Sequence, residues 1–243
     1  MDPKLLIKRK LQGLDGYDIK NQAALEQHVS WQVSNNEYDF EANLALLRLY
    51  QFYPEHFNAE YAKLVLLKAI CSQNPTDFTL YKYLIHLEHL SKEPLSRVVE
   101  LGFFLETCRF TEFWMKLKEN PKLVSSIPGF RESVYKFIAH IISQTYQRIP
   151  KTTLMSLLDI SSENDLKHFI KQYGWSETTT SNSDSGGATG ADGVQLILVN
   201  NHEENIKSIK IRERVNFDSI TSMSGAFRPS KSDFFIKTYN MNS

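Results

Sequence analysis

The sequence predicts a mainly α protein in which a HEAT/TPR-like helical repeat domain, residues 1–125, precedes a winged-helix domain, residues 126–223. In the first half, amphipathic helices begin every 17 to 19 residues, a spacing typical of two-helix solenoid repeats. After Ser125 the predicted order becomes helix, strand, helix, helix, strand, loop, strand, which is the order of a winged helix. We assign residues 224–243 to a C-terminal tail.

The helices of the first half are predicted from apolar side chains spaced three and four residues apart. Pro54 ends the first of them, and Asn58 is a suitable N-cap for the second. Each helix has an apolar face that needs a neighbour, so the helices are expected to stack as a solenoid, although the TPR consensus is absent. The predicted helices span residues 39–52, 59–71, 76–90, 95–107 and 111–119.

The second half combines helices with short apolar strands. Ser161 or Ser162 is expected to cap its third helix, and Gly174 to end it. Residues 177–193 are rich in Thr, Ser, Gly and Asp, so we predict a disordered insertion in the wing. The predicted helices span residues 130–148, 152–158 and 163–173, and the predicted strands span residues 149–150 and 194–199.

The composition excludes several classes of protein. The 28 Lys and Arg residues balance 28 Asp and Glu residues, which argues against a protein that coats nucleic acid or an anionic membrane. No apolar run is long enough to span a membrane, and the N-terminal residues do not resemble a signal peptide. Cys71 and Cys108 are too far apart for a CxxC motif, and we expect both to be buried, unreactive thiols. We therefore expect a cytoplasmic protein and leave a nuclear pool open.

No motif in the sequence predicts catalysis. His86 and His89 are spaced to share a metal ion, but no third ligand is evident, so ordinary packing is the preferred interpretation. The glycines of residues 186–193 precede a strand, whereas a phosphate-binding loop follows one. We expect neither an enzyme nor a cofactor, metal or small-molecule substrate.

A winged helix makes nucleic-acid binding the main alternative. Its third helix offers Lys167, His168 and Lys171, but Glu163 and Asp165 offset their charge. Affinity for phosphates depends on net positive charge, so this helix does not predict a DNA reader. A weak contact with RNA stays open.

Two groups of residues are candidates for binding a partner. The apolar strand 194–199 could pair with a strand of another chain at a free sheet edge. A basic cluster follows it, although nearby glutamates favour a solvated surface. The candidate residues are Val194, Leu196 and Leu198 in the strand and Lys207, Lys210, Arg212 and Arg214 in the basic cluster.

Six stretches together resemble one known family. They are YDFEANLALLRLYQFYP (38–54), LLKAICSQNPTDFTLYKYLI (66–85), LGFFLETCRFTEFW (101–114), GFRESVYKFIAHIISQTYQRI (129–149), LKHFIKQYGW (166–175) and VNFDSITSM (215–223). In their order and spacing they resemble the PCI-class family that includes subunit K of eukaryotic translation initiation factor three. The resemblance covers the chain from about residue 14 to about residue 223.

The resemblance implies a PCI-type architecture and a non-catalytic scaffold subunit of the initiation factor three complex. That assembly binds the small ribosomal subunit and supports mRNA and initiator-tRNA recruitment. The implied partners are other subunits of the complex, with subunit L as the expected neighbour. Alternatives are a PCI subunit of the proteasome lid or signalosome, or a free winged-helix nucleic-acid-binding protein. The long wing insertion and the tail depart from the family pattern.

Overall fold

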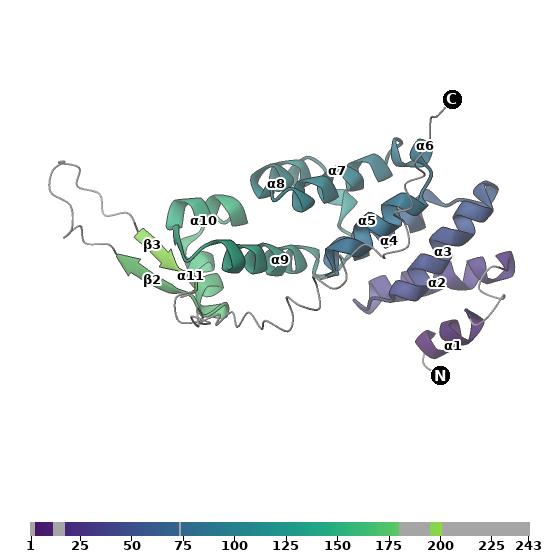
Figure 1. Ribbon diagram of the computed structural model, residues 1–243, viewed down its shortest axis with the longest axis horizontal. Helices are drawn as coiled ribbons and strands as arrows, with labels where there is room; N and C mark the ends of the chain where they lie inside the picture. The colour runs from purple at the N-terminus through teal and green to yellow at the C-terminus, as the bar shows by residue number, and fades with distance from the viewer. Residues whose placement is uncertain (1–2, 12–17, 73, 180–194, 201–243) are drawn as a thin grey trace, which may run out of the picture. The chain divides into compact units, whose positions relative to one another are not determined.

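The computed structural model describes residues 3–11, 18–72, 74–179 and 195–200 (Figure 1). Its first part consists of α-helices, as the sequence predicts, joined in places by short 3-10 helices. The elements are α1 (Pro3–Lys10), η2 (Ile19–Asn21), α2 (Gln22–Ser34), α3 (Phe40–Phe52), η3 (Pro54–His56), α4 (Ala59–Cys71), α5 (Pro75–Leu84), α6 (Leu87–Leu90), α7 (Leu95–Glu106), α8 (Phe110–Glu119) and η4 (Pro121–Leu123).

The helix starts follow from local side-chain chemistry. The Asp39 carboxylate accepts a hydrogen bond from the amide of Ala42 at 3.2 Å, and the Asn58 side chain accepts one from the amide of Glu60 at 3.0 Å. Both bonds satisfy amides that have no partner within the helix. Successive helices then pack on one another, α2 against α3, α3 against α5, α4 against α5 and α7, and α7 against α8. This is the mainly helical fold predicted from the repeat spacing.

The predicted helix over residues 76–90 is two helices in the structure. Ile85 and His86 have extended backbones between α5 and α6. Ile85 is buried, while the His86 ring accepts a hydrogen bond from the amide of Glu88 at 3.4 Å and so caps α6. The apolar period continues through the break, and for that reason the sequence pattern does not reveal it.

The second part follows the predicted order of elements. Within the described residues, its strands form one antiparallel sheet in the order β1-β3-β2. Residues 177–179, predicted as part of the disordered insertion, belong to a strand, and residues 180–193 lie outside the described residues. The elements are α9 (Phe130–Thr145), β1 (Arg148–Pro150), α10 (Lys151–Leu158), α11 (Glu163–Gln172), β2 (Ser176–Thr179) and β3 (Gln195–Leu198).

Packing is continuous across residue 125, where the sequence predicts a domain boundary. Helix α4 contacts α9, and α8 contacts α10. The indole Nε1 of Trp114 donates a hydrogen bond to the backbone oxygen of Leu157 at 3.0 Å, and the Trp114 side chain is buried. None of the helices in the described ranges combines the length and the apolar character that crossing a membrane requires.

Candidate functional site

The sheet has one face in the core and one face turned away from it. Ile197 in β3 lies between Ile149 in β1 and Glu177 in β2, and residues paired in this way share a face. Ile149 and Ile197 are both buried. Helix α10 contacts β1 and β3, so it contributes to the core at this sheet.

Leu196 and Leu198 lie on the opposite face, because side chains alternate along a strand. Leu196 pairs with Pro150 and Thr178, and both leucines are half-buried. These two candidate residues therefore belong to the outer face of the sheet. Whether they contact a partner stays a prediction.

The expected pairing of the strand at 194–199 with another chain is wrong. Strand β3 is the central strand and pairs with β1 on one side and β2 on the other. Its backbone groups are used within the sheet, so no edge is left for an added strand. The outer positions of the described sheet belong to β1 and β2.

Strand β2 is the better edge for pairing. Strand β1 is three residues long and ends at Pro150, which has no amide hydrogen to donate. Strand β2 has four residues, and the side chains of Ser176, Glu177 and Thr178 are exposed. Polar residues of this kind give no strand signal, so the sequence pattern did not identify β2 as the edge.

Aromatic packing fixes the start of β2 against α11. Trp175 precedes the strand and packs edge-on against Phe169, with ring centroids 5.6 Å apart. Its ring also lies 5.8 Å from that of Tyr173. Phe169 in turn meets Tyr135 of α9 at 6.2 Å. The edge strand is thus attached to buried rings rather than to a surface loop.

The outer face of α11 carries both signs of charge. Leu166, Phe169 and Ile170 are buried. The Lys151 ammonium pairs with Glu163 at the start of the helix, and this hydrogen bond lowers the pKa of the Glu163 carboxyl group. The exposed residues are Glu163, Asn164, Asp165, Lys167, His168, Lys171 and Gln172. Such a mixed surface suits a protein partner better than a phosphate backbone.

The other candidate partner-binding residues lie outside the described residues. They are Val194 next to β3 and the basic cluster Lys207, Lys210, Arg212 and Arg214.

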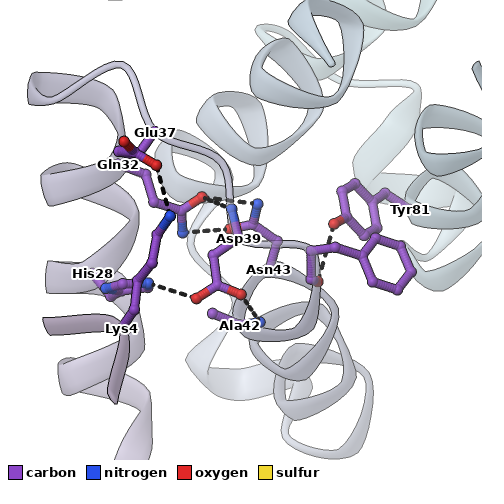
Figure 2. A network of polar contacts seen from close by, with 9 residues as sticks. Lys4, His28, Gln32, Glu37, Asp39, Ala42, Asn43 and Tyr81 are labelled. Carbon is purple, nitrogen blue, oxygen red and sulfur yellow. Dashed lines mark hydrogen bonds and ion pairs between the residues drawn. The ribbon is translucent and has the colours of Figure 1, made fainter. Parts of the chain in front are cut away.

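A second group of polar side chains lies between α2 and α3 (Figure 2). His28 Nε2 is 3.0 Å from the Asp39 carboxylate, and the His28 side chain is only 2% exposed. Burial would raise the pKa of the Asp39 carboxyl group, but hydrogen bonds from His28 and the amide of Ala42 outweigh burial, so that its pKa lies below the ordinary value. The Asp39 carboxylate therefore contacts His28 of α2 and also caps α3.

The same network continues through a pair of amide side chains. Gln32 Nε2 donates to Asn43 Oδ1 at 3.0 Å, and Asn43 Nδ2 donates back to Gln32 Oε1 at 3.2 Å. Gln32 Oε1 also accepts from the amide of Asp39 at 2.9 Å. Both amide side chains are buried. Their polar groups pair with each other, which is typical of a structural network.

Tyrosines extend this network to α5. The Tyr38 hydroxyl donates to Asp77 at 2.8 Å and lies 3.1 Å from the Tyr81 hydroxyl, which reaches the backbone oxygen of Phe40 at 3.1 Å. Burial, together with these contacts, raises the pKa of Tyr38 far above its ordinary value, so the phenol stays protonated and donates. These bonds fix the spacing of the helices.

The remaining candidates from the sequence are His86, His89, Cys71 and Cys108. His89 stacks on Phe57 with centroids 3.9 Å apart, and no group of three possible metal ligands occurs within the described part of the chain. Burial raises the pKa of the Cys71 thiol to about 11. Cys108 is exposed, contrary to expectation, because it lies in the turn after α7 with a positive φ of 57°.

Comparisons with known proteins agree on one family. Residues 56–204 match the model of the CSN8/PSMD8/EIF3K family. The chain is 41% identical over 217 residues to eukaryotic translation initiation factor 3 subunit K of Xenopus tropicalis, and 40% identical to that of Homo sapiens. Each match covers 89% of this chain and 93% of the relative. The subunit K of Bombyx mori is 38% identical over 213 residues, which are 88% of this chain and 91% of the relative.

Proposed function

Because this chain belongs to the CSN8/PSMD8/EIF3K family, we propose that it is a non-catalytic scaffold subunit of the cytoplasmic translation initiation factor 3 complex. The observation that carries the proposal is the match to subunit K over 217 residues, which are 89% of this chain. Through the complex, the chain supports recruitment of the small ribosomal subunit and mRNA. The family also includes proteins of other assemblies, but the names of the similar proteins favour this one.

We propose that the chain docks onto a neighbouring subunit, subunit L, through the β2 edge and the outer face of α11. In support, the backbone of β2 faces no other described strand on its outer side, and its side chains are exposed. Strand addition uses backbone hydrogen bonds and needs no special side-chain chemistry. The exposed acids and bases of α11 would then set the orientation.

Direct binding to RNA is a minor part of this proposal. The exposed face of α11 presents Lys167 and Lys171 together with Glu163 and Asp165. Phosphate binding requires an excess of cations and weakens steeply with salt. The isolated chain is therefore expected to bind RNA weakly, and the contact with the ribosome is expected to depend on the complex.

Proline substitutions in β2 test the docking mechanism. Successive backbone amides of a strand point to opposite sides, one toward β3 and the next toward the free edge of β2. Proline has no amide hydrogen, so of the two variants Glu177→Pro and Thr178→Pro, one removes an amide at the free edge and the other removes a hydrogen bond to β3. Each variant is co-expressed with subunit L as the full chain, next to matched Glu177→Ala and Thr178→Ala controls. Thermal unfolding identifies the proline that damages the sheet.

The proposal expects the proline variant that keeps its unfolding temperature to lose subunit L, whereas both alanine variants retain it. Retention of subunit L by the proline variant that keeps its unfolding temperature would rule out docking through the β2 edge. A wild-type chain that joins the complex without contacting subunit L would instead overturn the choice of neighbour and leave membership of the complex intact.

A further inference from the structure

A groove with no role in the proposed docking lies between the end of α3 and the α5–α6 break. It has a volume of about 500 Å³ and is lined by residues of α3, η3, α5 and α6. This volume is in the range of pockets that bind specific ligands or side chains. We call it the α3–α6 groove. The break at Ile85 and His86 forms part of its wall.

Two apolar side chains that line the groove are unusually exposed. Tyr83 is 78% exposed and Leu87 is 76% exposed, more than any other large apolar side chain in the described ranges. Both line the groove, together with Pro54 and Phe57. Single exposed apolar residues are common on proteins, but two of them beside a cavity are typical of a binding surface.

Three lining residues of the groove are held in place by aromatic contacts. Phe57 stacks on His89 with ring centroids 3.9 Å apart and meets Tyr50 edge-on at 5.3 Å. The Tyr50 hydroxyl donates a hydrogen bond to Glu26 at 2.7 Å. A binder would therefore meet a preformed surface, which lowers the entropic cost of association.

The charge of the groove restricts what can bind there. Its lining includes the carboxylate of Glu88 and no Lys or Arg. Glu55 lies in η3 between two lining residues, and neither carboxylate forms an ion pair with a described residue. Lys82, on the neighbouring helix, is already paired with Glu106 at 3.6 Å.

We propose that the α3–α6 groove docks an amphipathic segment of another protein that carries aliphatic side chains beside Lys or Arg. The aliphatic side chains would bury Tyr83 and Leu87, and the cation would pair with Glu88 or Glu55. This docking does not depend on the β2 edge, so either proposal can fail while the other stands.

The probe is a fluorescein-labelled synthetic peptide, KLLKKLLKKLLK, titrated against the full chain and followed by fluorescence anisotropy. A peptide with Glu in place of every Lys is the matched control for charge. Leu87→Ser tests the apolar contact, Glu88→Lys tests the charge, and Met115→Ser is a control at an apolar side chain of α8 that is 59% exposed. All three positions are exposed, so thermal unfolding is expected to stay at the wild-type temperature.

The proposal predicts that the Lys peptide binds the wild-type chain and that Leu87→Ser lowers the affinity for this peptide by about tenfold. Glu88→Lys should weaken binding of the Lys peptide and strengthen binding of the Glu peptide. Met115→Ser should leave the affinity for both peptides unchanged. Equal binding of both peptides to the wild-type chain, or unchanged binding to Leu87→Ser, would overturn the proposal.

Two other occupants give distinct results, and each would also overturn the proposal. A wild-type dimer in sedimentation that Leu87→Ser converts to a monomer would assign the groove to a second copy. A gain in peptide affinity on Phe235→Ser, in the C-terminal tail, would assign it to this chain's own tail.

Discussion

Gly102 allows α7 to pack closely on α5, and replacing it tests this packing. A Cβ atom added at Gly102 would lie 2.1 Å from Cζ and 2.2 Å from Cε1 of Phe78. Ordinary van der Waals contacts of a Cβ atom lie at 3.4–4 Å. The Phe78 ring, which is itself buried, must therefore move by more than 1 Å, or the two helices must separate.

The expected cost of Gly102→Ala follows from two opposing effects. Overpacking a well-packed core costs up to about 3 kcal/mol, and a contact this short belongs at the upper end of the range. Alanine in a helix interior is favoured over glycine by about 1 kcal/mol. We therefore expect Gly102→Ala to lower the free energy of unfolding by about 2 kcal/mol.

Urea unfolding followed by circular dichroism measures this cost, and a double-mutant cycle assigns its cause. Leucine lacks the ring atoms that the added Cβ would meet, so in the Phe78→Leu background Gly102→Ala should cost less than about 0.5 kcal/mol. An equal cost in both backgrounds, or a stabilised single variant, would refute the packing argument.

Three further predictions concern the same unfolding measurement. Trp114→Phe removes the hydrogen bond between α8 and α10 and leaves a carbonyl unpaired, so it should cost about 2 kcal/mol. Asp39→Asn keeps an N-cap but loses the charged contact with His28, so it should cost about 1–2 kcal/mol at pH 7. Because the folded-state pKa of Asp39 is lowered, the wild-type advantage is complete above its ordinary pKa of 3.8 and should disappear as the pH falls below it. Ile197→Ala should cost about 2–4 kcal/mol, whereas Leu196→Ala on the outer face should cost less than about 1 kcal/mol. Equal costs of Ile197→Ala and Leu196→Ala would contradict the assignment of the two sheet faces. A Trp114→Phe variant with the wild-type free energy of unfolding would contradict the α8–α10 hydrogen bond, and a difference between wild type and Asp39→Asn that does not change with pH would contradict the Asp39–His28 contact.

Helix positions were predictable where local chemistry sets them. Asn58 caps α4 as expected, and the predicted range 95–107 agrees with α7 to within one residue. These features depend on side chains close in sequence. The resemblance to the family likewise depends on sequence alone, and the comparisons confirm it.

Features set by contacts between distant residues were not predictable in the same way. Ile85 is buried and has an extended backbone, and no glycine or proline marks the break between α5 and α6. The central position of β3 depends on its pairing with both β1 and β2, so the apolar strand that looked like an edge is interior to the sheet. The polar strand β2 became the candidate edge only once the strand order was known.

The central claim is that this chain is a structural subunit of the initiation factor, and purification of the full tagged chain from cytoplasmic extract at moderate salt tests it most directly. Mass spectrometry of the retained proteins should identify the other initiation factor 3 subunits together with the small ribosomal subunit. Recovery of proteasome lid or signalosome subunits in their place, or of nucleic acid alone that is lost as salt rises, would contradict the account.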